Sequence, residues 1–198
     1  MVNSRKGIYV LFKRFADLAF GIISLFLALP LFLVIGLLIK LDSPGPIIFV
    51  QKRVGKHSNV FDIYKFRTMK VETPEDLPSS AITDPDKHLT RIGRFLRRTS
   101  IDELPQFVNI IKGDMSIIGP RPVIPNETTL ISLRKEMKVD TILPGVTGLA
   151  QIQGRDMIDA YTKAKMDAEY MQRMSFTLDV VIFMTTIVKV IKSEHVSH

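Results

Sequence analysis

One segment of the sequence breaks the pattern of a water-soluble protein. Residues 18–39 read LAFGIISLFLALPLFLVIGLLI, with no charged side chain. As a straight helix this segment would be roughly 33 Å long, enough to cross a bilayer hydrocarbon core of about 30 Å. A cleaved signal peptide fits poorly, because the apolar stretch is too long and no small-residue cleavage site follows it. The segment therefore predicts a chain that is held in a membrane.

A proline lies near the centre of this apolar segment. Pro30 cannot donate a backbone hydrogen bond and its ring clashes with the preceding turn, so we expect a kink there. Each half is then roughly 14 to 18 Å long, too short to cross a membrane alone. Basic residues, which favour the cytoplasmic face, flank both ends equally. A re-entrant hairpin and a kinked spanning helix both fit these features. The flanking basic residues are Arg5, Lys6, Lys13, Arg14, Lys40, Lys52, Arg53 and Lys56.

Composition narrows the partners of the chain. The 27 Lys and Arg residues exceed the 20 Asp and Glu residues, which gives a formal charge of +7. Such a charge favours nucleic acid, acidic lipid headgroups or phosphate-bearing substrates. The sequence contains no cysteine, which excludes disulfides and thiolate metal sites, and its four histidines lack the spacing of zinc ligands. A length of 198 residues suits one compact core.

Residues beyond 42 show the shorter patterns of a compact domain. A Pro/Gly turn at 43–46 precedes two predicted strands, 47–51 and 60–66, joined by a turn at 55–59. Apolar residues spaced three and four positions apart predict several helices further along. The expected helices cover residues 87–98, 104–111, 127–138, 157–174 and 176–191, with a surface loop at 71–86 and a short apolar run at 117–122.

These elements predict an α/β fold that is mostly helical, with a small β-hairpin or sheet. We divide the chain into residues 1–42, the N-terminal flank and membrane segment, and residues 43–198, a compact domain facing the cytoplasm. The last predicted helix, FTLDVVIFMTTIVKVI, is strongly apolar but too short and interrupted for a membrane span. We therefore expect it to lie on the membrane surface or to pack in the core.

The densest cluster of reactive side chains is RRTSIDELPQ, residues 97–106. Two adjacent carboxylates, Asp102 and Glu103, follow two arginines and begin an amphipathic helix. One carboxylate can attack an electrophile while the other holds a divalent cation against a diphosphate. The guanidinium groups of Arg97 and Arg98 would keep both acids ionised and would balance phosphate charge. The cluster is therefore a candidate site of phosphoryl chemistry.

A structural explanation of the same acidic pair remains open. Ser100 and Glu103 have the spacing of a capping box, and acids in a first helical turn complement the helix dipole without any catalysis. Pro105 fits that explanation badly, because a cap at Ser100 places it at the fifth helical position.

Three other segments offer candidate phosphate ligands. Pro120 and Pro122 hold Arg121 in a rigid turn, although a plain surface turn is the commoner explanation of such a segment. The glycine-rich stretch 144–155 allows close backbone approach and ends in Arg155, but glycines alone are weak evidence for a ligand loop. Lys65 and Arg67 add positive charge beside a predicted strand, where a solvated strand edge is the alternative.

One short motif suggests a different reaction. Asp84 and Asp86 have the D-x-D spacing that many metal-dependent glycosyltransferases use to bind UDP-sugars. They lie in the acidic, proline-rich stretch that we expect to be a surface loop, which argues against this role.

Taken in order, these segments resemble the catalytic core of the monotopic phosphoglycosyl transferases, the bacterial sugar transferase family. The resemblance runs from about residue 13 to residue 192. The matching segments are KRFADLAF, SPGPIIFVQKRVG, FDIYKFRTM, TRIGRFLRRTSIDELPQFVNIIKGDMSIIGPRP, PGVTGLAQIQGR and MDAEYM. Each segment alone is weak, but this number of them in one order is highly specific.

The resemblance implies a role for several residues. Asp102 becomes the nucleophile, and Glu103, with Asp102 beside it, becomes the Mg²⁺ site. Pro30 becomes the break of a re-entrant helix–break–helix that dips into one leaflet, although Leu29 stands where the family often has a serine. Arg121 and Arg155 are expected to bind the diphosphate of the nucleotide-sugar. The full set of expected substrate-binding residues is Lys65, Arg67, Arg97, Arg98, Pro120, Arg121, Gln151 and Arg155.

The resemblance also implies the reaction and its location. We expect transfer of a phosphosugar from a UDP-sugar to polyprenyl (undecaprenyl) phosphate with release of UMP, through a phosphosugar–aspartate intermediate. The chain resembles the small members of the family, which carry only the catalytic core. We expect it in the bacterial inner membrane, with the catalytic domain facing the cytoplasm. Its expected partners include inner-membrane lipid and a possible second copy of the chain. A glycosyltransferase that releases UDP and a non-enzymatic, membrane-anchored basic protein are the alternatives. Few aromatic residues lie among the basic clusters, which argues against a nucleic-acid partner.

Overall fold

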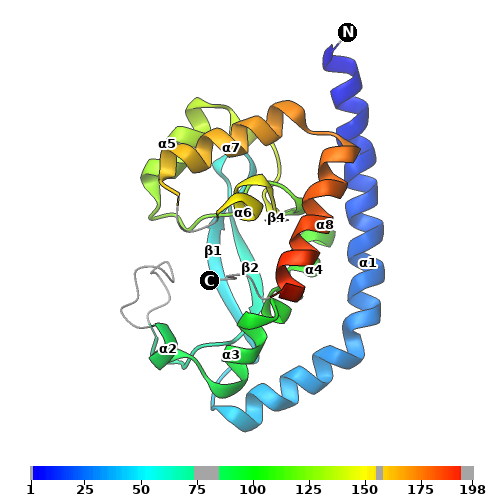
Figure 1. Cartoon of the computed structure of the whole chain (residues 1–198). Coiled ribbons are helices and arrows are strands. Elements are labelled where there is room, and N and C mark those ends of the chain that lie inside the picture. The colour runs from blue at the N-terminus through cyan, green and yellow to red at the C-terminus, as the bar shows by residue number, and fades with distance from the viewer. Residues whose placement is uncertain (1, 74–84, 155–157, 193–198) are drawn as a thin grey trace.

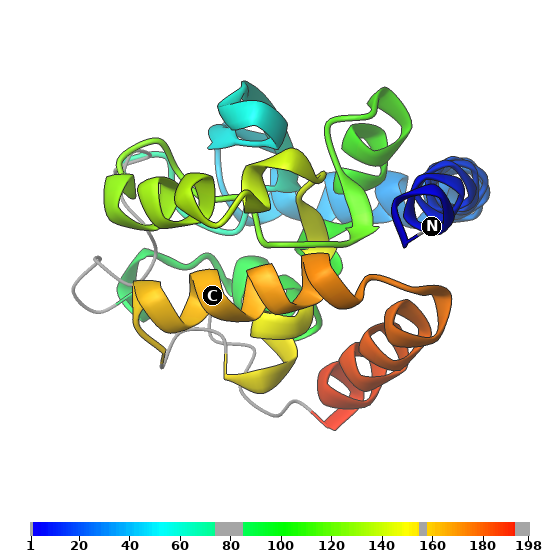
Figure 2. The same cartoon turned by 90° about the horizontal axis from the view of Figure 1, so that it is seen from above.

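The computed structural model describes residues 2–73, 85–154 and 158–192. A long N-terminal helix, α1 (Val2–Asp42), runs along one side of the molecule. A β-hairpin stands at the centre, and the later helices close around it (Figures 1 and 2). The described chain is mostly helical, as expected, and has two small sheets where one small hairpin or sheet was expected.

Helix α1 is continuous through Pro30. Figure 1 shows that the last part of the helix turns away from the axis of the longer first part. The structure therefore has one bent helix here, where the family resemblance implies a helix, a break at Pro30 and a second helix. Proline removes a single backbone donor, and the helix continues because its C-terminal part packs against the domain through Ile35, Ile39 and the ring of Phe32 on Phe66.

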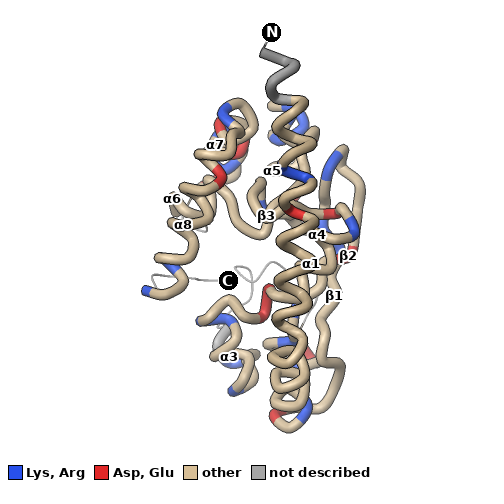
Figure 3. The backbone as a smooth tube through the Cα atoms, turned by 90° about the vertical axis from the view of Figure 1, so that its right-hand side faces the viewer, with Lys and Arg blue, Asp and Glu red and all other residues tan. Residues whose placement is uncertain are grey.

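Much of α1 has no protein partner. The stretch Gly7–Asp42 is the one helical segment in the described ranges that is long and apolar enough to cross a membrane, and 17% of its most apolar window is buried. The sequence has no charged residue between Asp17 and Lys40, and Figure 3 shows a correspondingly long tan stretch of α1. A core helix of a soluble protein would be mostly buried. Most of the apolar surface of α1 is instead left uncovered by the rest of the protein.

The central hairpin confirms the two predicted strands. Strands β1 (Ile48–Val54) and β2 (Val60–Phe66) pair antiparallel, with Ile48 opposite Phe66 and Val54 opposite Val60. β1 continues three residues beyond its predicted end. The turn η1 (Lys56–Ser58) places His57 at φ 55° and so reverses the chain within the predicted range.

The acidic pair follows two short helices. α2 (Pro85–His88) and α3 (Arg91–Arg98) replace the single predicted helix at 87–98. The Thr90 side chain accepts a hydrogen bond from the Gly93 backbone N–H and so starts α3 afresh. After the turn η3 (Ile101–Glu103), α4 (Gln106–Lys112) lies within two residues of the helix predicted at 104–111 and ends at Gly113, where φ is 92°.

The second half of the chain encloses the far end of the hairpin. β3 (Ser116–Ile118) pairs parallel with β4 (Gly145–Thr147), and α5 (Thr128–Glu136) packs with α7 (Ala160–Arg173) at the end shown uppermost in Figure 1. The turn η4 (Val139–Thr141) and α6 (Leu149–Gln153) connect these elements. The surface loop predicted at 71–86 lies largely outside the described residues.

The last helix, α8 (Phe176–Lys192), lies beside α1. Ile182 is fully buried, and Phe183 packs edge-on against Phe20 of α1. The carboxylate of Asp179 accepts hydrogen bonds from Lys13 Nζ at 2.6 Å and from the Tyr9 hydroxyl at 2.8 Å. α8 thus ties α1 to the domain, while its other face remains exposed and apolar through Val180, Val181, Met184, Ile187, Val188 and Ile191.

Candidate active site

The structure brings four of the expected site residues together, and two of them contact the same carboxylate oxygen of a third. Lys65 of β2 and Arg121 of the turn after β3 each donate to Glu103 Oε1 at 2.8 Å. Asp102 precedes Glu103 in η3, and both side chains are buried. The cluster joins residues that lie 38 and 18 positions apart in the chain. A buried ion pair of this kind requires close geometry to offset desolvation, so its parts are held in place.

The local backbone excludes the capping-box explanation of the acidic pair. Ser100 lies in the left-handed region, with φ at 55°, and its side chain caps no helix end. The Glu103 backbone N–H instead donates to the Ser100 carbonyl at 3.2 Å, which closes a 3-10 turn. α4 begins only after Pro105. The two carboxylates therefore lie in a tight turn ahead of the helix and point into the protein.

Asp102 is a buried carboxylate with an unused oxygen. The residue is 3% exposed, and its Oδ1 has no hydrogen-bond partner among the described residues. Burial raises the pKa of Asp102 to about 6; the charge of Lys65 lowers it, that of Glu103 raises it, and those of Arg97 and Arg121 lower it further. Near neutral pH the side chain is therefore an ionised and poorly solvated carboxylate, a combination typical of functional sites.

Lys65 supplies the positive charge that lowers the pKa of Asp102 most. Burial lowers the pKa of Lys65, and the neighbouring Glu103 opposes that effect. Lys65 Nζ and Arg121 Nη2 share one oxygen of Glu103, so positive charge is concentrated on the side of the acidic pair that faces β2 and the turn after β3. An anionic ligand such as a diphosphate would complete the charge balance of this cluster.

Helix α3 positions a third cation. Arg97 Nε donates to Thr68 Oγ1 at 3.0 Å, which holds its guanidinium near Asp102. α3 reaches this position because Gly93 lies directly against the Thr68 backbone. A Cβ atom on Gly93 would come within 1.9 Å of the Thr68 carbonyl oxygen. Glycine is therefore required at that position for the close approach.

Among the described residues, the others that were expected to bind substrate make no hydrogen bond or ion pair with the acidic pair. Arg67 is buried, and its guanidinium donates to the backbone carbonyls of Ser43 and Pro44, which fixes the turn after α1 rather than reaching the acidic pair. Arg98 is exposed on α3. Pro120 is buried and its carbonyl accepts from the Gly145 backbone N–H at 2.9 Å. Arg155 lies outside the described residues.

Gln151 has the unsatisfied polar groups expected of a ligand-binding residue. Both polar atoms of its carboxamide are buried and lack hydrogen-bond partners within the described ranges. Nε2 of Gln106, a fully buried residue in the DELPQ segment, is in the same state. Buried polar atoms without partners cost free energy, so each is a place where a ligand or water completes the structure.

Two arginines near the site were missed by the sequence analysis. Arg53 of β1 lies close enough to Arg121 that burial and this like charge lower its pKa to about 10. Arg134 of α5 donates from Nη1 to the backbone carbonyl of Arg121 at 2.9 Å. Helical spacing placed Arg134 on a polar face, and nothing in that spacing indicated that the turn at Arg121 packs against it.

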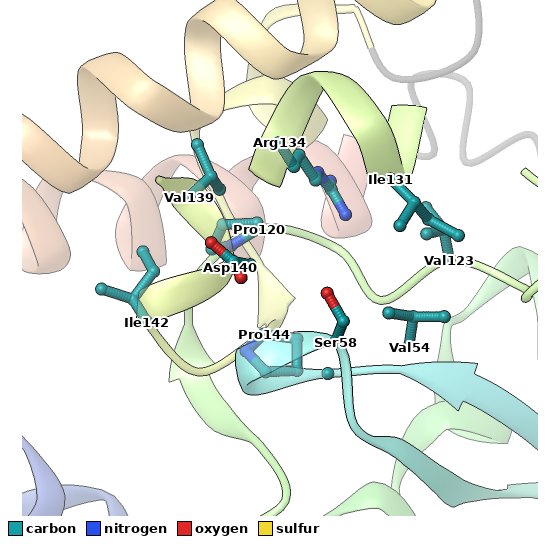
Figure 4. Close-up of a pocket in the computed structure, with 11 residues that line it drawn as sticks. Val54, Ser58, Pro120, Val123, Ile131, Arg134, Val139, Asp140, Ile142 and Pro144 are labelled. Atoms are coloured by element: carbon teal, nitrogen blue, oxygen red, sulfur yellow. The ribbon is translucent and has the colours of Figure 1, made fainter. Parts of the chain in front are cut away.

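A separate pocket lies beside the turn that carries Arg121. Its empty volume is about 380 Å³, and neither Asp102 nor Glu103 lines it. Figure 4 shows Asp140, Ser58 and Arg134 as its polar side chains. The apolar lining comes from Val54, Pro120, Val123, Ile131, Val139, Ile142 and Pro144.

The acidic pair fits a Mg²⁺ ion that is shared with a substrate. Within the described ranges, no group of three or more His, Cys, Asp or Glu side chains could hold a metal ion. Mg²⁺ keeps several waters and commonly binds through one or two carboxylates together with substrate phosphates. Asp102, with its unpartnered Oδ1, and Glu103 provide two such carboxylates.

Comparison with known proteins agrees with the order of the segments. The family model of the bacterial sugar transferases matches residues 8–193. The chain is 41% identical over 187 residues to UDP-N-acetylgalactosamine-undecaprenyl-phosphate N-acetylgalactosaminephosphotransferase of Aeromonas hydrophila, covering 91% of this chain and 44% of that protein. It is 40% identical over 190 residues to UDP-glucose:undecaprenyl-phosphate glucose-1-phosphate transferase of Escherichia coli, covering 92% of this chain and 41% of that protein.

A shorter relative has a similar length. The chain is 38% identical over 185 residues to an uncharacterized sugar transferase of Bacillus subtilis, covering 93% of this chain and 90% of that protein. The chain thus spans less than half of the two larger relatives and most of the shorter one. The family match over nearly all of its residues shows that the chain belongs to the bacterial sugar transferase family.

Proposed function

We propose that this protein transfers a phosphosugar from a UDP-sugar to undecaprenyl phosphate, with Asp102 as the nucleophile. The observation that carries the proposal is the unpartnered Oδ1 of Asp102, buried beside Glu103 and within the field of Lys65, Arg97 and Arg121. Two of the matched relatives are named for transfer of a sugar phosphate to undecaprenyl phosphate, which supports the same reaction class here.

The reaction proceeds by two displacements at one phosphorus atom. In the first, an oxygen of the Asp102 carboxylate attacks the sugar-bearing phosphorus of the UDP-sugar. The bond from that phosphorus to the bridging oxygen breaks, and its electron pair leaves on UMP. In the second, a phosphate oxygen of undecaprenyl phosphate attacks the same phosphorus. The bond to Asp102 breaks, which restores the carboxylate and gives undecaprenyl diphosphate-sugar.

The division of labour between the two acids follows from their contacts. Glu103 Oε1 accepts from both Lys65 and Arg121, so its lone pairs are directed to cations. Asp102 Oδ1 has no such donor and keeps a lone pair for attack. The three cations lie where negative charge builds up on the phosphoryl oxygens, and fixed charges of this kind contribute most to phosphoryl transfer.

A Mg²⁺ ion fits this site as part of the same proposal. Glu103 and Asp102 would hold it, with phosphate oxygens and waters as its other ligands. When bound, it would offset negative charge on the diphosphate. Lys65 and Arg121 would meanwhile keep Glu103 oriented, since both contact the same carboxylate oxygen.

We further propose that α1 enters one leaflet of the bacterial inner membrane and returns, with the catalytic domain on the cytoplasmic side. Its apolar centre is largely unburied, its basic residues lie at both ends, and the helix bends in its last part (Figures 1 and 3). The exposed apolar face of α8 extends the same lipid-facing surface. This placement would bring Asp102 to the depth of the lipid-borne acceptor phosphate.

Nucleotide release by the membrane-reconstituted protein tests the function. The protein is supplied with Mg²⁺, undecaprenyl phosphate and, one at a time, UDP-glucose, UDP-galactose, UDP-N-acetylglucosamine and UDP-N-acetylgalactosamine. We expect UMP with one donor, together with a sugar-bearing diphosphate lipid and a trapped phosphosugar adduct on Asp102 when the acceptor is omitted. Release of UDP would overturn the proposal, because the sugar would then move without its phosphate.

A further inference from the structure

The turn that carries Arg121 is held by its carbonyl groups. Two prolines in this turn, Pro120 and Pro122, have no backbone N–H and cannot donate. Four successive carbonyls, from Pro120 to Val123, each accept a hydrogen bond from a different partner. These donors are the Gly145 N–H at 2.9 Å, Arg134 Nη1 at 2.9 Å, Arg53 Nη1 at 3.2 Å and the Val54 N–H at 2.8 Å.

The donor to Arg121 is itself fixed by a buried carboxylate. Arg134 Nε and Nη2 donate to Asp167 Oδ2 of α7 at 2.9 and 2.7 Å. The exposed fractions of the two side chains are 12% for Arg134 and 2% for Asp167. Burial raises the pKa of Asp167, and the positive charge of Arg134 opposes this effect.

The contacts form one continuous series from α7 to the acidic pair. Asp167 orients the guanidinium of Arg134, and Arg134 holds the backbone of Arg121. The side chain of Arg121 then donates to Glu103 Oε1 at 2.8 Å. A guanidinium presents donors at fixed angles, so one arginine can bind a carboxylate on one edge and a carbonyl on the other.

From this geometry we infer that Arg134 and Asp167 are positioning residues for the proposed phosphosugar transfer, acting through Arg121. They touch no reacting atom. They fix the backbone from which Arg121 reaches Glu103, and so set where its charge meets the diphosphate. The inference rests on the proposed function. Its magnitude follows from the general sensitivity of transfer reactions, in which a displacement of about 1 Å costs on the order of 100-fold in rate.

A double-mutant cycle separates positioning from simple structural support. The variants are Arg134→Gln, Arg121→Gln and the double variant, assayed as full-length protein in membranes by nucleotide release from the active UDP-sugar. We expect Arg134→Gln to lower kcat/KM by about 10- to 100-fold in the wild-type background. In the Arg121→Gln background it should lower kcat/KM by less than about 3-fold, because the group it positions is already gone.

Conservative variants keep the test valid if Arg134→Gln folds poorly. Arg134→Lys can reach either Asp167 or the Arg121 carbonyl but cannot reproduce both edges of the guanidinium, so it should rescue the thermal midpoint more than the activity. Asp167→Asn should show the same dependence on Arg121. The matched control is Glu169→Gln on α7, which breaks an exposed ion pair to Arg173 and should stay within about 2-fold of wild type.

Each outcome has a definite meaning. Equal losses in the two backgrounds would make Arg134 a structural residue and overturn the inference, while UMP release and its dependence on Asp102 would still support the proposed function. An unchanged kcat/KM in Arg121→Gln alone would also overturn the inference, because Arg134 and Asp167 would then be positioning a residue that the reaction does not use. UDP release by the wild type would instead reject the proposed function, whatever the cycle shows.

Discussion

Lys65 Nζ lies 2.8 Å from Glu103 Oε1, across 38 residues of sequence, and Arg121 reaches that same oxygen. This arrangement leaves Asp102 beside a carboxylate that is paired with two cations. It also separates the two acids chemically, because Glu103 is engaged with cations while Asp102 Oδ1 is not.

Replacing Asp102 with asparagine should remove activity and stabilise the fold. Loss of the nucleophile is expected to lower turnover by about 1,000-fold or more. The pKa of about 6 lies above the ordinary 3.8, so the folded state prefers the protonated form and loses stability as pH rises through 6. Asparagine removes that cost and should increase the free energy of unfolding at pH 8 by about 1–3 kcal/mol.

Thermal unfolding of both proteins at pH 8 and pH 4 provides the measurement. The difference between Asp102→Asn and wild type should shrink to less than about 1 kcal/mol at pH 4, where Asp102 is protonated in the folded state and about half protonated in the unfolded state. A variant that is less stable than wild type at pH 8 would show that the site favours the ionised carboxylate.

The pH dependence of turnover should report the ionisation of Asp102. The carboxylate must be ionised to attack, and its pKa lies near 6. We expect kcat/KM to increase with pH up to about 6 and to level off above it, falling about tenfold per unit below. Initial rates of nucleotide release between pH 5 and pH 8 measure this profile. A flat profile through pH 6 would contradict the assignment.

Removing the charge of Lys65 should move this pH profile upward. The positive charge of Lys65 lowers the pKa of Asp102, so Lys65→Met should raise it and shift the ascending limb to higher pH. Methionine keeps the length of the buried stem. Lys52→Met, on the same hairpin, is the matched control because Lys52 pairs with Asp62 at an exposed position. An unchanged limb in Lys65→Met would exclude this electrostatic role.

Any side chain at Gly93 should displace α3 and the Arg97 that it carries. The added Cβ would meet the Thr68 carbonyl oxygen at 1.9 Å, so Gly93→Ala is expected to destabilise the protein by more than about 2 kcal/mol. Gly7→Ala is the control, because nothing lies within 4 Å of a Cβ there. Chemical denaturation in detergent compares the two. Equal stability of both variants would show that α3 adjusts without cost.

Local sequence patterns were sufficient to predict most of the helices and the β-hairpin of this fold. The uncharged stretch between Asp17 and Lys40 predicted a membrane-type helix, and the spacing of apolar residues over 104–111 predicted α4. The hairpin followed from alternation and turn residues. The adjacency of Asp102 and Glu103 was visible in the chain, as was the ordered set of segments that identified the family. These properties depend on neighbouring residues, and so they can be derived without a fold.

Long-range packing decided everything that requires two distant segments to meet. Lys65 reaches Glu103, while Arg67, two residues later, binds the turn at Ser43 and Pro44. The sequence had made both of them candidate phosphate ligands. Ser100 adopts a left-handed conformation instead of capping a helix, and α1 continues through Pro30 because tertiary contacts hold its last part. The raised pKa of Asp102 likewise comes from burial, which only the folded chain supplies.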